Sequence, residues 1–291
     1  MSSLYERLRP LLAQLPVEQF RNPPPVVPVI RLAGPIGQIG VLRSGLALSR
    51  FASVIERAFA VRDLKAVALV VNSPGGSAVQ SALIAKRIRD LATEKSVPVY
   101  AFVEDVAASG GYWLACAADE IFAENTSIVG SIGVVSASFG FVEAMRRLGI
   151  QRRVYTAGER KRLLDPFLEE DPAGIERLKA VQQDMHESFK DLVRERRGGK
   201  LAADDETLFN GDIWTGRTAL RLGLVDGIGE VRSVMRERFG DKVQLRLVEG
   251  ERRRRWLPSI PFRAARRDPF DIVDEVISRV EERLLWSRFG L

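Results

Sequence analysis

Short apolar segments alternate with stretches of helical spacing along the first half of the chain, and this alternation constrains the fold most strongly. The apolar segments cover residues 26–32, 66–71 and 97–103, and helices are expected at about 46–60 and 78–91. Continuous apolar runs such as 66–71 are typical of strands that are buried on both faces of a sheet. Strands alternating with helices predict an α/β fold with a mainly parallel sheet and right-handed crossovers.

The second half continues this pattern and then changes character. We expect helices at 109–118, 141–148, 172–196, 218–222 and 231–239, and strands at 120–123 and 153–156. Residues 251–269 are rich in arginine and proline, whereas residues 270–289 have the spacing of an amphipathic helix. We therefore divide the chain into an N-terminal arm (1–25), a central α/β domain (26–240) and a basic linker with a C-terminal helix (241–291).

Composition excludes several classes of protein. The single cysteine, Cys116, rules out an intrachain disulfide framework and a site built from several cysteines. No apolar stretch is long enough to cross a bilayer, and residues 1–20 lack the apolar core of a signal peptide, so we expect a cytoplasmic location. The net charge of +6 includes a block from Arg252 to Arg255 that suits peripheral contact with an anionic membrane. No nucleic-acid-binding motif accompanies it, and no nucleic-acid partner is expected.

Ser109 is the candidate nucleophile. It lies in the string Ala107-Ala108-Ser109-Gly110-Gly111, between an expected strand and an expected helix. A serine at such a corner presents its hydroxyl clear of the backbone, and the glycines allow another segment to approach closely. The usual base is a histidine, but His186 is the only one and falls in a long charged helix. The base is therefore expected to be another group.

Two further segments suit the same chemistry. Gly75 lies in Ser73-Pro74-Gly75-Gly76, after a buried strand and before a helix, where free backbone N–H groups can bind an oxyanion. The N–H of Gly110, next to the nucleophile, is the second expected donor. Lys161 follows the strand expected at 153–156, and a lysine acts as a base only in its neutral form. Its charged neighbours make Lys161 an ordinary surface residue on this pattern alone.

The motifs occur in the order seen in the signal peptide peptidase A (protease IV) family, and the chain resembles its shorter single-domain members over about residues 26–240. The strings that carry the resemblance are Ser73-Pro74-Gly75-Gly76, Ala107-Ala108-Ser109-Gly110-Gly111-Tyr112, Gly130-Ser131-Ile132-Gly133-Val134, Lys161 to Pro166, and Thr215-Gly216 with Ala219 to Asp226. The resemblance implies a fold like that of the Clp protease subunit and the crotonases, made of repeated β-β-α units.

The resemblance also implies the roles of the site residues. Ser109 would be the nucleophile, Lys161 the general base, Ser131 a hydrogen-bond partner of the lysine, and Gly75 and Gly110 the oxyanion donors. No metal or organic cofactor is implied. In single-domain relatives the serine and lysine come from neighbouring subunits of a ring, so a homo-oligomer is expected, an octamer by resemblance. The expected substrates are small, unfolded or hydrophobic peptides such as remnant signal peptides.

Two other functions are weighed against this one. A Clp-type protease needs a histidine soon after the Gly130 to Val134 string, and His186 comes too late in the chain. An inactive crotonase-fold protein, or one that handles acyl-CoA, would share the glycine turn at Gly75 but has no need for Ser109 and Lys161 together.

Overall fold

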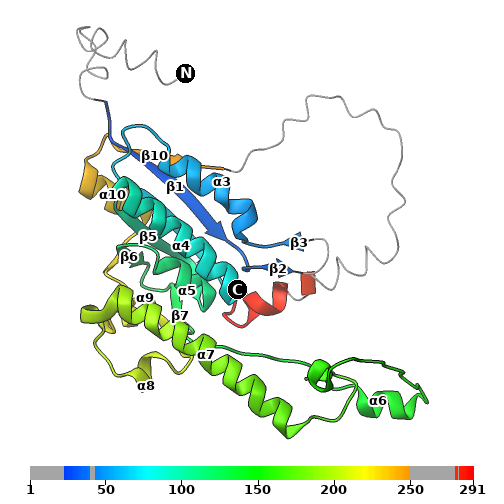
Figure 1. Cartoon of the computed structure of the whole chain (residues 1–291). Coiled ribbons are helices and arrows are strands. Elements are labelled where there is room, and N and C mark those ends of the chain that lie inside the picture. Colours follow the sequence, from blue (N-terminus) through cyan, green and yellow to red (C-terminus); the bar gives the residue numbers. More distant parts are fainter. Residues whose placement is uncertain (1–22, 40–42, 250–278, 281) are drawn as a thin grey trace, which may run out of the picture.

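The computed structural model describes residues 23–39, 43–249, 279–280 and 282–291, and its centre is a mainly parallel sheet (Figure 1). The strand order is β10-β1-β4-β5-β6-β9, with β7 paired to β5 and β8 paired antiparallel to β7. The strands of this sheet are β1 (Val26–Ala33), β4 (Val67–Ser73), β5 (Val99–Ala108), β6 (Glu120–Ala123), β7 (Ile128–Gly130), β8 (Ile213–Thr215), β9 (Gly227–Ile228) and β10 (Gln244–Leu247). A small separate pair contains β2 (Gln38–Ile39) and β3 (Arg43–Ser44).

Helices connect and cover these strands (Figure 1). The α-helices are α3 (Leu48–Phe59), α4 (Ala78–Lys95), α5 (Gly110–Ala115), α6 (Val142–Arg147), α7 (Pro172–Arg197), α8 (Asp205–Leu208), α9 (Gly216–Arg221) and α10 (Val231–Phe239). Two short 3₁₀-helices are η1 (Glu159–Arg162) and η2 (Gly198–Lys200). The predicted α/β class with a mainly parallel sheet is confirmed. Residues 279–280 and 282–287 are helical, whereas residues 270–278 of the predicted C-terminal helix and the 251–269 linker lie outside the described residues.

Both faces of the sheet are buried, which explains the continuous apolar runs. Leu69 and Val71 of β4 pack in the cluster formed with α3, α4 and α5. Ala68 and Val70, which alternate with them, face the second cluster, where α10 contributes Val234 and Met235. Because neighbouring residues of a strand point to opposite faces, a strand covered on both sides needs apolar residues at every position.

The structure corrects the prediction in several places. β5 continues past the expected end at residue 103 to Ala108, through a shift of its register with β4 between Val71 and Ser73. The strand expected at 153–156 is absent, because these residues pair with no other described strand. β10 pairs with β1, so the sheet includes residues beyond the predicted domain boundary at 240.

Residues 133–171, here called the extension, leave the sheet after β7 and run past the N-terminal end of α7, with α6 near their tip (Figure 1). α7 begins at Pro172, and the Asp171 carboxylate accepts hydrogen bonds from the first free amides. Nearer its other end, Phe189 packs on Trp113 of α5 with ring centroids 4.8 Å apart. One end of α7 is thus fixed to the body, and the other end carries the extension.

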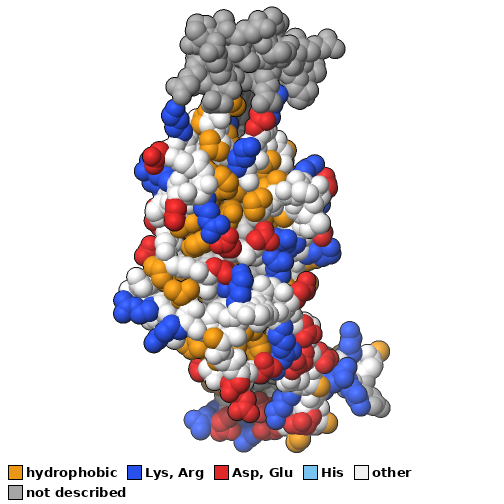
Figure 2. All heavy atoms as spheres, turned by 90° about the vertical axis from the view of Figure 1, so that its left-hand side faces the viewer, with side chains coloured by type: hydrophobic (Ala, Val, Ile, Leu, Met, Phe, Trp, Pro, Cys, Tyr) orange, Lys and Arg blue, Asp and Glu red, His pale blue; other side chains and the backbone are white. Residues whose placement is uncertain are grey.

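The surface to the left of Figure 1 carries lysine, arginine, aspartate and glutamate side chains interspersed with apolar ones (Figure 2). Mixed charges of this kind do not build a single-sign field over that face. Within the described ranges, no helix combines the length and the apolar character that crossing a membrane requires.

Candidate active site

Ser109 occupies the corner between β5 and α5. Its backbone has φ 52° and ψ −121°, a combination that costs free energy for a residue with a side chain. Its amide donates to the carbonyl of Gly130 in β7 at 2.8 Å, which holds the strained residue in place. The side chain is half-buried. This is the geometry expected of a nucleophile at the carboxyl end of a parallel strand, where sites in open α/β sheets are found.

Gly75 lies directly against this corner. A methyl group built on Gly75 would be 2.8 Å from the Ser109 Cβ, 2.8 Å from the Ala108 carbonyl oxygen and 3.0 Å from the Gly110 nitrogen. The close approach and its φ of +101° both require glycine. The Gly75 amide donates to Ser73 Oγ at 3.2 Å, so serving as an oxyanion donor would mean exchanging that long bond. The next residue, Gly76, is exposed, and its nitrogen is 3.5 Å from a methyl built on Gly110.

Ser131 lies beside Ser109. The two serines follow Ala108 and Gly130, which are register partners in the paired strands β5 and β7. Ser131 also has a positive φ of 52°, and its amide donates to the Asp212 carbonyl at 2.6 Å. His186 Nε2 is 3.1 Å from the Ile132 carbonyl oxygen, so the histidine bonds the backbone after Ser131.

Lys161 is distant from these residues in one chain. It is exposed in η1, and the next turn is anchored by Leu163, whose Cδ1 is 2.8 Å from a methyl built on Gly174. Gly174 and Phe189, the residue that packs on α5, are 15 positions apart in α7. At 1.5 Å per residue this is about 22 Å along the helix axis, several times the length of a lysine side chain. The structure therefore brings together Ser109, Gly75, Gly110 and Ser131, but not Lys161 of the same chain.

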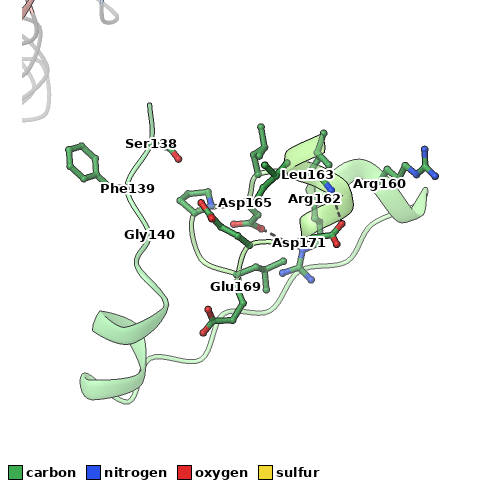
Figure 3. Close-up of a pocket in the computed structure, with 15 residues that line it drawn as sticks. Ser138, Phe139, Gly140, Arg160, Arg162, Leu163, Asp165, Glu169 and Asp171 are labelled. Atoms are coloured by element: carbon green, nitrogen blue, oxygen red, sulfur yellow. Dashed lines mark hydrogen bonds and ion pairs between the residues drawn. The ribbon is translucent and has the colours of Figure 1, made fainter. Parts of the chain in front are cut away.

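A cavity of about 370 Å³ lies in the extension rather than at Ser109 (Figure 3). Its lining comes from residues 138–140, 160, 162–166 and 168–171, and from Gly174 and Ile175 at the start of α7. None of the residues gathered around Ser109 lines it, so it is not the catalytic cleft of a single chain. Arg160 and Arg162, the two neighbours of Lys161 in the sequence, are among its lining residues.

Beneath α5, a buried ion pair that the sequence did not reveal supports the site. The Arg197 side chain is 2% exposed, and its Nη1 donates to the Asp226 carboxylate at 2.5 Å. Burial opposes ionisation of Asp226, but the bonds from Arg197 and Lys200 outweigh it and lower the pKa of this carboxyl. Asp226 also accepts from the Ile121 amide at 2.7 Å. Its place in the Gly223 to Asp226 string was visible in the sequence, but its partner was not.

The same region fixes α5 through Tyr112, whose hydroxyl donates to the Leu224 carbonyl at 2.8 Å. Burial raises the pKa of Tyr112 well above its usual value and that of the neighbouring Cys116 to about 12. Both groups are therefore neutral and structural, and neither supplies a nucleophile.

Comparison with known proteins shows that the chain matches a protein family. Residues 92–244, a span that includes Ser109, Ser131 and Lys161, match the family described as "Peptidase family S49". The "Na(+)/H(+) antiporter NhaA" of Brucella abortus (strain 2308) is 50% identical over 297 residues, which is 100% of this chain and 40% of that protein. The "Serine protease SPPA, chloroplastic" of Arabidopsis thaliana is 34% identical over 68% of this chain and 31% of its own length.

A further relative, the "Putative protease MJ0651" of Methanocaldococcus jannaschii, is 36% identical over 60% of this chain and 55% of its own length. The chain thus spans less than two thirds of each of these relatives. The name of the Brucella protein describes an antiporter, but this chain covers only 40% of that protein's length. The name therefore assigns no transport activity to this chain.

Proposed function

Because the chain belongs to peptidase family S49, we propose that it is a serine endopeptidase in which Ser109 of one copy works with Lys161 of a neighbouring copy. The predicted resemblance to the signal peptide peptidase A family is confirmed by this membership. The observation that carries the proposal is the placement of the two residues. Ser109 lies at a strained corner against glycine backbone, whereas Lys161 is exposed at the far end of α7.

The proposed reaction is acyl transfer. Nζ of a neutral Lys161 takes the proton of Ser109 Oγ as the oxygen attacks the peptide carbonyl, and a tetrahedral oxyanion forms. The Gly110 amide and the Gly75 turn supply its hydrogen-bond donors. The lysine then gives the proton to the leaving amine, and water, deprotonated by the same lysine, releases the acyl group from Ser109. Ser131, beside Ser109, accepts or donates a hydrogen bond that orients the incoming amine.

The proposed assembly is supported by the apolar side chains that a single chain exposes to water. The extension exposes Phe139 to 79% and Tyr155 to 91%, together with Val135, Leu148 and Ile150. Apolar side chains that gather on one projecting segment mark an interaction surface. A second copy that covers them would also bring Lys161 to Ser109. Such a head-to-tail contact closes into a ring when its rotation allows, and we retain the octamer as the proposed size.

The experiment mixes two inactive variants, Ser109→Ala and Lys161→Ala. Each alone lacks one member of every dyad, but a Lys161→Ala chain beside a Ser109→Ala chain has one complete site. With random 1:1 mixing in a ring, about one quarter of the sites are complete, so about one quarter of wild-type peptidase activity is expected. Exchange is verified by co-purification of differently tagged chains. A mixture that exchanges fully and stays as inactive as its parents rules out the shared dyad.

Labelling with a fluorophosphonate tests the peptidase chemistry itself. The probe is expected to modify wild type and not Ser109→Ala. Absence of labelling in the wild type would instead indicate the inactive or acyl-CoA-handling alternative.

The natural substrate and the location are separate proposals. Small, unfolded or hydrophobic peptides, including remnant signal peptides, fit the family and the names of relatives such as the "Putative signal peptide peptidase SppA" of Enterococcus faecium. We propose a cytoplasmic location with peripheral membrane contact through the basic region at 252–255. Cell fractionation with and without high salt tests it, because contact through arginine is weakened by salt.

A further inference from the structure

The Asp165 carboxylate is the centre of a charged cluster next to Lys161. Its side chain is only 8% exposed, and both of its oxygens accept from Arg152 Nη1 at 2.5 Å. Arg162 Nε lies 3.5 Å away, and the Phe167 amide donates to the same carboxylate at 3.1 Å. The bond from Arg152 outweighs partial burial and lowers the pKa of Asp165, so the group is a carboxylate.

Aromatic packing fastens this cluster to the rest of the extension. The Arg152 guanidinium lies 4.6 Å from the centre of the Phe167 ring, and Phe141 stacks on the same ring at 5.4 Å. The Phe141 amide also donates to the Pro166 carbonyl at 2.7 Å. The residues on either side of Asp165 are therefore held by the segment that enters α6, which limits how far η1 can move.

The three consecutive cationic residues Arg160, Lys161 and Arg162 lie in different environments. Arg162 turns toward Asp165, whereas the Arg160 guanidinium points away from that carboxylate (Figure 3). Among the contacts of the described residues, no hydrogen bond or ion pair engages the Lys161 ammonium. The charge of Arg162 is thus neutralised by Asp165, and the Lys161 ammonium remains available to contact another chain.

We propose that Asp165 is a positioning residue for Lys161, which holds η1 in the orientation that delivers the amine to Ser109 of the neighbouring copy. This inference rests on the proposed function. Without the carboxylate, Arg152 and Arg162 would face each other with no counterion, and like charges at this range repel. The η1 turn would then shift, and a displacement of about 1 Å at a reacting group lowers a rate by about 100-fold.

The first test compares Asp165→Asn with Glu169→Gln. Both remove one negative charge from the wall of the same cavity, but Glu169 is 81% exposed and lies 3.5 Å from Arg146, outside the cluster. Asp165→Asn should lower kcat and the rate of fluorophosphonate labelling of Ser109 by about 10- to 100-fold with little change in KM. Arg152→Gln should give the same pattern, Asp165→Glu should recover part of the rate, and Glu169→Gln should match wild type.

The second test separates positioning from a general effect on assembly. In the mixture of Ser109→Ala and Lys161→Ala chains, only the Ser109→Ala chain supplies a working lysine. Asp165→Asn on that chain should lower the restored activity by the same 10- to 100-fold, whereas on the Lys161→Ala chain it should have no effect. Equal loss in both placements, or loss in neither, overturns the inference.

The two hypotheses fail in distinguishable ways. If Lys161→Ala labels as fast as wild type, the lysine is not the base, and the proposed function and the inference fall together. If Lys161→Ala abolishes labelling while Asp165→Asn leaves it unchanged, only the inference is wrong. If mixing restores nothing although Lys161→Ala and Asp165→Asn each reduce labelling, the shared dyad is wrong, and the delivery of Lys161 to a neighbouring copy by Asp165 is wrong with it.

Discussion

Replacement of Gly75 by alanine should damage both the fold and the site. The added methyl would lie 2.8 Å from both the Ser109 Cβ and the Ala108 oxygen, and 3.0 Å from the Gly110 nitrogen. Ordinary carbon contacts are about 3.5–4.0 Å, so the neighbours must move by roughly 0.7 Å. Two of these three atoms are backbone and the third is the Cβ of the nucleophile, so no side-chain rotation relieves the overlap.

Gly34→Ala is the matched control. Gly34 has the same φ of +101°, but no atom lies within 4 Å of a methyl built on it. Both variants carry backbone strain of about 1–3 kcal/mol, and only Gly75→Ala adds an overlap of about 1–3 kcal/mol. We expect Gly34→Ala to lose about 1–3 kcal/mol of unfolding free energy and Gly75→Ala about 2–6 kcal/mol.

The site effect is read from the labelling rate. A shift of Ser109 by most of an ångström should slow fluorophosphonate labelling by about 10- to 100-fold in Gly75→Ala, and Gly34→Ala should label like wild type. Denaturant unfolding gives the stability of each variant separately. Equal stabilities and equal labelling rates for the two variants would show that Gly75 does not approach Ser109 as the structure has it.

The buried ion pair and the thiol give further predictions. Arg197→Met should lower the unfolding free energy by about 3–5 kcal/mol in denaturant, because Asp226 loses its buried partner; a loss below about 1 kcal/mol would contradict this. Since the folded-state pKa of Asp226 is lowered, its contribution is present above pH about 4 and is lost as the pH falls through the folded value. The difference between wild type and Arg197→Met should therefore shrink in acid rather than grow. Cys116, with a pKa of about 12, should react with Ellman's reagent only on unfolding, and fast reaction of the native protein would refute its burial.

The sequence predicted the long buried elements because their signal is local. A strand covered on both faces, such as β4, is apolar at every position, and β6 was predicted at its observed bounds. β8 and β9 were missed because strands of three and two residues are too short to show a period. β10 was missed because its pairing with β1 joins opposite ends of the domain, and no local pattern records that contact.

The site was predictable to different degrees. Small residues around Ser109 and the glycine turn at Gly75 follow from how closely two backbones approach there. Only the family resemblance predicted Lys161 as the base, because its charged neighbours are typical of a surface lysine. The structure shows that one of these neighbours, Arg162, bonds to Asp165. The charged cluster around Asp165 had no signal in the sequence, because Arg152 reaches this carboxylate only through the fold of the extension.

The two disagreements between sequence and structure that lie in the extension have one physical explanation under the proposed assembly. Residues 153–156 have the pattern of a strand, yet in one chain they pair with no described strand and Tyr155 is 91% exposed. Lys161 has the family's position for a base, yet the turn that follows it is held against Gly174, about 22 Å along α7 from Phe189, which packs on the body. A strand needs a neighbour to satisfy its backbone, and a lysine base needs burial to lose its proton. A second copy packed on the extension supplies both, so each feature that is incomplete in one chain requires the same contact.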